Sequence, residues 1–273
     1  MKKILLFLLV MTLVFACSVG CTDSSDETKP TTAPTQAPTQ APTPEVTTAP
    51  SSDPTPMPEP VEAPVADILD IRFENGAPVN KTSNAATFKT YGSPVVDTDS
   101  TINMTVATFD GSSAFAIENI GDYYDLLEKG FTMEIYFSIA DTTNEVGIVA
   151  NMEKGGFGFD YVPGNSSFGF NVYTGSYTHP YYTSPAETDV YYHVVATYDC
   201  SDICLFVDGK YDNECETGDV IFPEETSQRL VIGADSTSNG VEGNFTGSIA
   251  FVRIYSSILS DAQIDALYNS LGK

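Results

Sequence analysis

The sequence predicts an all-β protein whose folded part is a jelly-roll sandwich of two antiparallel sheets. Short runs rich in Val, Ile, Phe and Tyr recur along the chain, separated by clusters of Gly, Asp, Asn and Pro. Several of these runs alternate apolar and polar residues, which is the period of a strand with one buried face. Almost no helical pattern lies between them, and regularly spaced strands without helices are typical of sandwiches.

Seven segments carry the strand pattern most clearly. The first, "ADILDIRFEN", sets Leu69, Ile71 and Phe73 against Asp70 and Arg72. Because successive side chains of a strand point to opposite faces, one face of each segment should reach the core. The predicted strands lie within residues 66–75, 132–139, 167–175, 193–199, 204–209, 229–235 and 248–256.

Two short helices interrupt this pattern. The segment "NIGDYYDLLEKG" predicts one or two helical turns that end at Gly130. Near the C-terminus, "SDAQIDALYNSLG" begins with Ser260 and has Gln263 three residues later, which is the spacing of a capping box. The apolar residues of this second helix fall on one face, which should pack against the edge of the sandwich. They are Ile264, Leu267, Tyr268 and Leu271.

The N-terminal residues 1–16 have the layout of a lipoprotein signal peptide. Two lysines precede an apolar run from Ile4 to Ala16, which is too short to span a bilayer. The run ends in "LVFAC", which resembles a bacterial lipobox and implies lipid attachment at Cys17; Cys21 is the weaker candidate. The alternative is an ordinary signal peptide with incidental cysteines. Lipidation would anchor the protein on the extracellular face of the cell membrane, without a transmembrane helix.

Residues 17–64 are expected to form a disordered linker rich in Thr and Pro. The unit "APTQ" repeats within it, and too few apolar residues are present to recover the entropy lost on ordering. Proline favours extended polyproline II at about 3.1 Å per residue, so the segment suits a spacer that lifts a domain off a membrane.

Residues 65–273 remain as one folded domain of a size common for β-sandwiches. The whole chain has 12 Lys and Arg residues against 37 Asp and Glu, giving a net charge of -25. Nucleic-acid binding depends on Lys and Arg, so nucleic acid is excluded as an expected partner. The acidic balance also gives no basic patch for anionic lipids.

Four ordered motifs resemble one protein family. They are "FTMEIYFSI", "YYHVVATYDCSDICLFVDGK", "RLVIGAD" and "FTGSIAFVRIYSSILSDAQIDALY", and "FDGSSAF" precedes all four. In this order they resemble the laminin-G-like branch of the concanavalin A-like lectin/glucanase superfamily. The resemblance covers essentially all of residues 65–273 and implies the concanavalin A-like jelly roll.

The segment from Tyr191 to Lys210 could be a catalytic or metal site, because it holds His193 and two cysteines. We interpret it instead as adjacent strands, with Asp208-Gly209 as a two-residue hairpin turn. The family has a His at the position of His193, which implies a structural role.

Glycosidase chemistry needs two carboxylates about 5 Å apart in the retaining mechanism. The related glucanases use "E-x-D-x-E", whereas the nearest match here, "ETDVY" from Glu187 to Tyr191, ends in Tyr and falls where the family has a loop. Motifs for serine hydrolases, zinc proteases and phosphate loops are absent from the sequence. The sequence therefore predicts no enzyme.

The domain contains three cysteines, Cys200, Cys204 and Cys215. An extracellular location permits a disulfide. Cys200 and Cys204 flank a turn, while Cys204 and Cys215 would share a sheet face if Asp208-Gly209 is the turn. Either pair remains open, and one thiol is left over. A zinc site formed by two cysteines with Asp199 and Asp202 is the weaker interpretation, because zinc normally takes four ligands that include more Cys or His residues.

Calcium is the cofactor that the family resemblance suggests, since many laminin-G-like domains bind it through oxygen ligands. The candidate ligands here are Glu74, Asp110 and Asp235. Related domains often read "GSIDEVRIY", whereas this chain has Ala250 and Phe251 in place of the two acids. That departure counts against the metal.

A tyrosine-rich stretch is the candidate ligand-binding surface. Aromatic rings stack on sugar rings, and polar groups fix the hydroxyls. The chain has no Trp, and "NVYTGSYTHPYYTS" supplies the candidates Tyr173, Tyr177, His179, Tyr181 and Tyr182. The leading function is thus non-catalytic binding of an extracellular carbohydrate or glycoconjugate. The alternative is adhesion to, or assembly with, a surface protein; a degenerate glycoside hydrolase is the third hypothesis.

Overall fold

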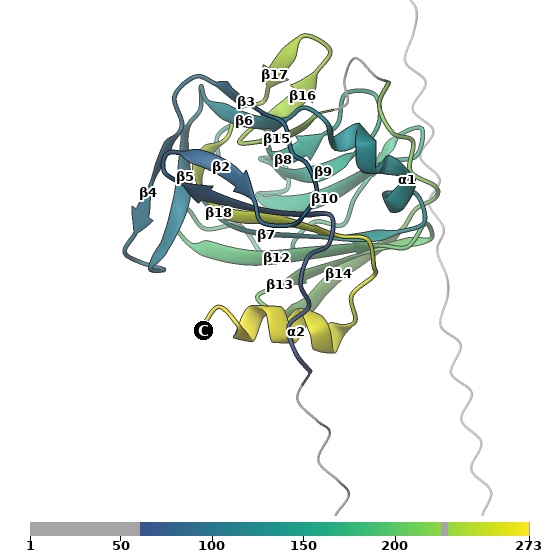
Figure 1. Cartoon of the computed structure of the whole chain (residues 1–273). Helices are drawn as coiled ribbons and strands as arrows, with labels where there is room; N and C mark the ends of the chain where they lie inside the picture. Colours follow the sequence, from purple (N-terminus) through teal and green to yellow (C-terminus); the bar gives the residue numbers. More distant parts are fainter. Residues whose placement is uncertain (1–60, 225–228, 273) are drawn as a thin grey trace, which may run out of the picture. The chain divides into compact units, whose positions relative to one another are not determined.

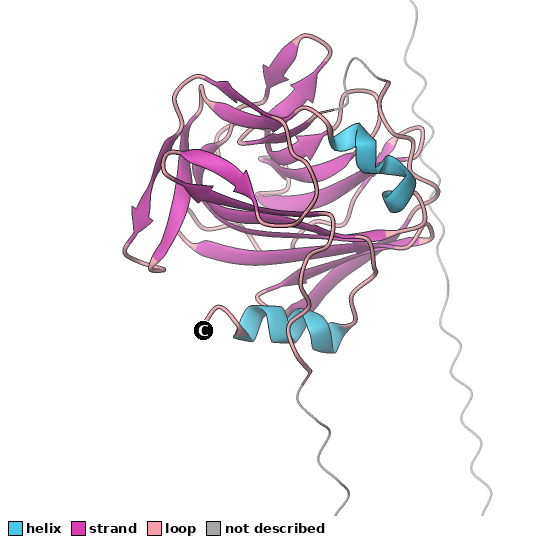
Figure 2. Cartoon of the chain, in the orientation of Figure 1, coloured by secondary structure: helices cyan, strands magenta, loops and turns pink. Residues whose placement is uncertain are grey.

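The structure, a computed structural model, describes residues 61–224 and 229–272. Two large antiparallel sheets stack face to face in this part of the chain, as the sequence predicts (Figures 1 and 2). The expected signal peptide, Cys17 and nearly all of the expected linker lie outside the described residues. None of the described helices is long and apolar enough to cross a membrane.

The nine-stranded sheet follows the order β14-β13-β12-β7-β18-β1-β2, and β5, which pairs with β4, also pairs with β18. Its long central strand β7 is buried on both faces, because the core covers one side and further side chains cover the other. The strands are β1 (Leu69–Glu74), β2 (Ala77–Asn80), β4 (Val95–Asp99), β5 (Met104–Asp110), β7 (Phe131–Ile139), β12 (Tyr191–Tyr198), β13 (Asp202–Val207), β14 (Lys210–Glu216) and β18 (Thr246–Tyr255).

The seven-stranded sheet follows the order β11-β10-β9-β8-β15-β6-β3. The hairpin of β16 (Asp235–Thr237) and β17 (Gly240–Glu242) continues from β15. Arg229 holds this hairpin, because its Nη1 donates to the carbonyl oxygen of Thr237 at 2.8 Å. The seven strands are β3 (Phe88–Tyr91), β6 (Ala114–Ile117), β8 (Val146–Asn151), β9 (Phe157–Val162), β10 (Ser167–Tyr173), β11 (Tyr177–Thr178) and β15 (Leu230–Ile232).

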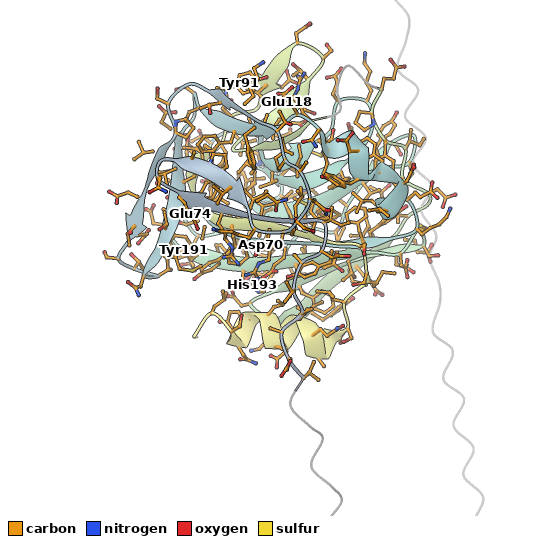
Figure 3. All side chains as sticks on the ribbon, viewed as in Figure 1. Asp70, Glu74, Tyr91, Glu118, Tyr191 and His193 are labelled. Carbon is orange, nitrogen blue, oxygen red and sulfur yellow. The ribbon has the colours of Figure 1, made fainter. Side chains whose placement is uncertain are left out.

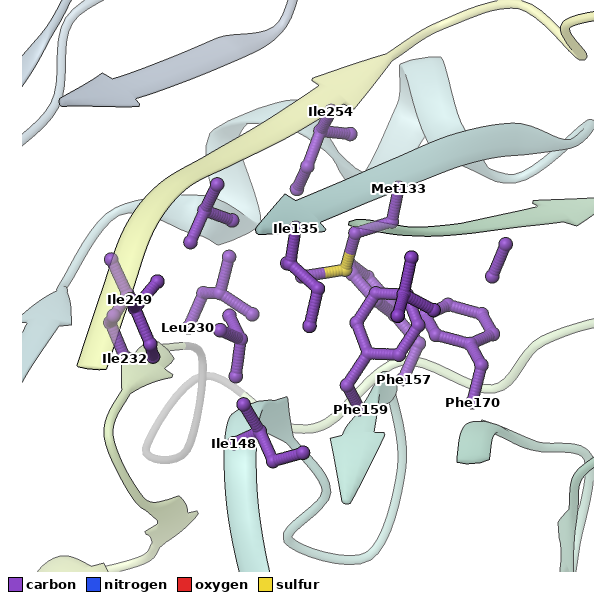
Figure 4. Packing of buried hydrophobic residues seen from close by; sticks show 14 of the residues in the cluster. Met133, Ile135, Ile148, Phe157, Phe159, Phe170, Leu230, Ile232, Ile249 and Ile254 are labelled. Carbon is purple, nitrogen blue, oxygen red and sulfur yellow. The ribbon is translucent and has the colours of Figure 1, made fainter. Parts of the chain in front are cut away.

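The core fills the space between the two sheets. Figure 4 shows Met133, Ile135 and Ile254 of the nine-stranded sheet facing Phe159 and Phe170 of the seven-stranded sheet. The rings of Phe159 and Phe170 lie 4.8 Å apart between centroids, within the range of favourable aromatic pairs. The alternating apolar residues of the sequence therefore supply both inner faces, as predicted.

The two helices form where the sequence places them. A 3-10 turn, η1 (Ile120–Tyr123), leads into α1 (Tyr124–Leu127), and Gly130 follows with a φ of 120°. The second helix, α2 (Asp261–Asn269), starts with the predicted capping box of Ser260 and Gln263.

The helix α2 lies on the outer face of the nine-stranded sheet, beside the edge strand β14. Its buried Ile264 and Leu267 lie against Val195, Phe206 and Tyr255. These three residues belong to β12, β13 and β18, so the helix covers the outer face of the nine-stranded sheet on the side of its edge strand β14, where the sequence predicts it. The outer sheet face presents the apolar patch that the buried side of the helix needs.

The predicted structural role of His193 fits its surroundings. His193 is fully buried on the outer face of the nine-stranded sheet, and its Nε2 lies 2.8 Å from Glu134 Oε1. Arg253 Nη1 donates to the same carboxylate at 3.0 Å, and Tyr255 donates to it at 2.5 Å. Figure 3 places His193 and Asp70 on the side of the molecule where α2 lies. A buried carboxylate with these donors is an internal ionic cluster.

The hairpin turn is confirmed, but the predicted register of the cysteines is wrong. Asp208 and Gly209 have φ values of 51° and 77° and join β13 to β14, as expected for a two-residue turn. A bulge between Leu205 and Phe206 adds one residue to β14, so Cys204 lies level with Glu214 and Cys215 is no longer its diagonal neighbour on the same face. One extra residue moves a side chain to the other face of a strand.

The bulge separates the two cysteines. Cys204 packs against the cluster under α2, whereas Cys215 and Cys200 pack against the main core. All three are free thiols in the described part of the chain, so neither predicted disulfide is present there.

Candidate functional site

An acidic pocket lies on the outer face of the seven-stranded sheet, beside the hairpin of β16 and β17. Its volume is about 250 Å³. Four carboxylates line it, Glu145, Asp160, Asp235 and Glu242, together with Met152 and several backbone groups. No Lys or Arg side chain is among the described residues that line it. The pocket thus combines a high density of negative charge with a small cavity that is open to solvent.

Glycines on both sides of Asp160 create this pocket. Asp160 is central in β9 and lies level with Gly147 of β8 and Gly169 of β10. A Cβ atom at Gly147 would meet the backbone nitrogen of Asp235 at 2.7 Å, and one at Gly169 would meet the ring of Tyr181 at 2.8 Å. The absence of side chains at these two positions lets β16 approach from one side and Tyr181 from the other, so that Asp160 becomes the floor.

Asp160 is an unusual carboxylate for a binding surface. It is 6% exposed, and its Oδ1 has no hydrogen-bond partner among the described residues. Burial is the main cause that raises the pKa of Asp160 to about 7, and the charges of Glu145 and Asp235 add to it, while a hydrogen bond from Asn171 acts in the opposite direction. A buried carboxylate oxygen without a donor is costly, so the group favours either a proton or a positively charged partner.

Asp235 forms the pocket wall that β16 contributes. Its Oδ1 accepts hydrogen bonds from the backbone nitrogens of Met152 at 3.0 Å and Ser236 at 2.6 Å. Burial raises the pKa of Asp235 to about 6 despite these bonds, and the charges of Glu242 and Glu153 contribute. The backbone contacts fix the carboxylate in place before any ligand arrives.

None of the five predicted ligand-binding residues lines the pocket, but Tyr177, His179 and Tyr181 lie next to residues that do. The rings of Tyr173 and Tyr177 lie 4.9 Å apart, and those of His179 and Tyr181 lie 4.2 Å apart. The hydroxyl of Tyr177 donates to the carbonyl of Met152, a residue of the pocket wall. Tyr177 is 39% exposed, so its ring is available to a ligand.

Electrostatic contacts also connect the aromatic residues with the carboxylates. Burial first, and then the charges of Asp160 and Glu145, raise the pKa of Tyr181. Burial raises the pKa of Tyr177 to about 12, with a contribution from Asp235. Desolvation lowers the pKa of His179, which keeps its imidazole neutral near pH 7.

Tyr182 is the member of the predicted cluster that the structure places elsewhere. Its ring stacks on Phe168 at 5.0 Å and an interplanar angle of 15°, and it packs against the main core. Successive residues of an extended segment point to opposite sides, so Tyr181 and Tyr182 cannot both face the pocket.

The three predicted calcium ligands do not lie together. Glu74 forms an ion pair with Lys81. Asp110 accepts hydrogen bonds from the hydroxyls of Ser112 at 2.9 Å and Ser113 at 2.8 Å. Asp235 alone lines the acidic pocket. The described residues contain no group of three or more His, Cys, Asp or Glu side chains arranged for a metal ion.

The acidic motif "ETDVY", the nearest match to the glucanase pattern, has its acidic residues in a loop, as the sequence predicts. Glu187 and Asp189 are both exposed and precede β12. They are separate from the acidic pocket.

Sequence reasoning did not identify Glu145, Asp160 and Glu242 as site residues. A signal for Asp160 was nevertheless present: "FGFDYV" and "FGFNV" alternate Phe with Gly, Asp or Asn. In both strands the Phe residues belong to the core, so the small and polar residues share the outer face. Glu145 and Glu242 are loop and hairpin residues that carry no comparable pattern.

The fold defines the class of the protein as a jelly-roll sandwich of the lectin type. The family model described as the concanavalin A-like lectin/glucanases superfamily matches residues 109–265. The chain therefore belongs to this superfamily, and the resemblance found in the sequence is confirmed. A comparison with curated proteins finds no match.

Solved structures with the same fold include receptor-binding domains of botulinum neurotoxins. One is from a study of type C, whose cell entry depends on two ganglioside molecules; it has a TM-score of 0.59 and 13% identity, over 76% of this chain and 51% of that chain. Another is the binding domain of neurotoxin DC in complex with rat synaptotagmin II, with a TM-score of 0.60 and 14% identity, over 76% of this chain and 52% of that chain. The present chain thus spans about half the length of these structures, and identities this low show the fold alone.

Proposed function

We propose that this protein is a lipid-anchored module on the extracellular face of a cell membrane that binds carbohydrate or glycoconjugate without catalysing a reaction. The observation that carries the binding function is the acidic pocket of Asp160 and Asp235 with Tyr177 and Tyr181 beside it. Sugar sites combine aromatic rings with a few fixed polar groups, and this arrangement provides both. The membrane anchor rests on the lipobox-like sequence that ends at Cys17.

The chemistry of the two pocket aspartates favours binding over glycoside hydrolysis. A glycosidase needs one carboxylic acid that stays protonated and a second carboxylate that is ionised. Here the pKa values of Asp160 and Asp235 are both raised, to about 7 and about 6. Their environments therefore do not make one of them the protonated acid and the other the ionised carboxylate.

A glycan array probed with the full chain tests the binding function. We expect defined sugar binding that falls at least about tenfold in Tyr177→Ala, because the exposed ring is the nearest stacking surface. Tyr211→Ala is the matched control, since Tyr211 is 51% exposed but lies on β14 of the other sheet. The absence of any sugar binding would contradict the proposal.

The second candidate function is binding to a surface protein. The neurotoxin structure with rat synaptotagmin II supports it, because a domain of the same fold there binds a protein. Capture of a defined surface protein from intact cells, combined with a negative glycan array, would favour this alternative.

A further inference from the structure

We propose that the acidic pocket selects glycans that carry a free amino group, such as deacetylated amino sugars, over neutral and anionic sugars. The inference rests on the proposed function, because it names the class of sugar that the same site would bind. Asp160 lines this pocket, and its buried Oδ1 has no hydrogen-bond donor among the described residues.

The charge of the pocket has no counterion in its own walls. Glu145, Asp160, Asp235 and Glu242 contribute four carboxyl groups to a space of about 250 Å³. The neighbouring His179 does not balance them, because desolvation lowers its pKa and leaves the ring neutral. A positively charged ligand would therefore supply the counterion that the described residues of the pocket do not provide.

An ammonium group matches the acceptors of the pocket. It has three N–H donors and no acceptor, and is compact enough to enter a small cavity. Asp160 offers an unused oxygen at the floor, while Asp235 is held in position by two backbone N–H groups. Hydrogen bonds between ionised groups are stronger than neutral ones, so the pairing would add both affinity and orientation.

The aromatic neighbours explain why the amine should belong to a sugar. Tyr177 presents an exposed ring beside the pocket, and Tyr181 covers Gly169, which lies level with Asp160. A pyranose ring that stacks here could direct its amino substituent toward Asp160. A sialylated or otherwise anionic sugar would meet carboxylates of its own sign, and the net charge of -25 would add long-range repulsion.

Calorimetric titration of the full chain with two matched oligosaccharides tests the inference. The first is a glucosamine tetramer with free amino groups, and the second is the N-acetylglucosamine tetramer. We expect the free amine to bind at least tenfold more tightly at pH 7, where a large share of its amino groups carries a proton. Asp160→Asn should remove this preference, whereas Asp125→Asn, an exposed acid in α1, should leave it unchanged.

The outcomes separate this inference from the proposed function. Equal binding of both tetramers, lost in Tyr177→Ala, would overturn the amine preference but keep the sugar site. A preference that survives in Asp160→Asn would also overturn it, because general surface charge would then explain the binding. Failure of both tetramers and of the wider glycan array would overturn the proposed function as well.

Discussion

Replacing Asp160 with Asn should make the protein more stable at neutral and alkaline pH. The ionised carboxylate of Asp160 is 6% exposed and has an oxygen without a donor, which is an unfavourable state. Asn has nearly the same shape and remains neutral at every pH. It therefore imitates the protonated form of Asp160 without the need to bind a proton.

The magnitude follows from the pKa of Asp160. Burial raises this pKa from its ordinary value of 3.8 to about 7, so the folded state holds a proton that the unfolded state releases. Stability consequently declines as the pH rises from about 4 to about 7, and the full loss is reached above that range. A difference of about three pKa units corresponds to about 4 kcal/mol, which is the upper limit of the gain expected for Asp160→Asn at pH 8.

Urea denaturation of the full chain between pH 4 and pH 8 measures this effect. The wild type should lose stability across that range, and Asp160→Asn should lose less. The groups that face Asp160 in the pocket are Glu145, Asp235, Glu242 and the ring of Tyr181. Because burial also raises the pKa of Asp235 to about 6, a smaller decline should remain in the variant. An Asn variant that is less stable than the wild type at pH 8, with an unchanged pH profile, would refute this reasoning.

Two further predictions concern the rest of the fold. Glu134→Ala should lower the free energy of unfolding by about 3–5 kcal/mol in urea titrations, because the fully buried His193 and the hydroxyl of Tyr255 would lose their shared carboxylate partner; retention of wild-type stability would show that the ionic cluster is dispensable. Gly209→Ala should cost about 1–3 kcal/mol, since its φ of 77° is strained for other residues and its Cβ would meet Tyr268 at 2.8 Å. Gly218→Ala is the control, with no atom within 4 Å of the added Cβ, and equal effects in the two variants would contradict the turn geometry.

The features predicted correctly from the sequence are those that depend on neighbouring residues. The two-residue turn at Asp208 and Gly209, the capping box of Ser260 and the alternating strands all follow from local backbone preferences. The opposite faces of Cys204 and Cys215 could not be foreseen in this way. A single bulge decides the register, and no residue type in β13 or β14 marks where it occurs.

The candidate site was only partly predictable for the same reason. Tyr177 and Tyr181 were recognised because one aromatic-rich segment contains both. The pocket itself forms only because Asp160 of β9 and Asp235 of β16 lie close together in space. These two residues are 75 positions apart in the sequence. The depth of the pocket depends on Gly147 in a third strand. The proximity of these residues is set by the order of strands in the sheet, which local sequence patterns do not specify.

The most direct test of the sugar-binding site is a heteronuclear NMR titration of the full chain with the glycan that gives the strongest array signal. We expect chemical-shift changes to concentrate in β8, β9, β16 and residues 177–181, which surround the acidic pocket. Changes concentrated in β13, β14 or α2 would place the ligand on the other sheet and contradict the site. Binding without any change near Asp160 would do the same.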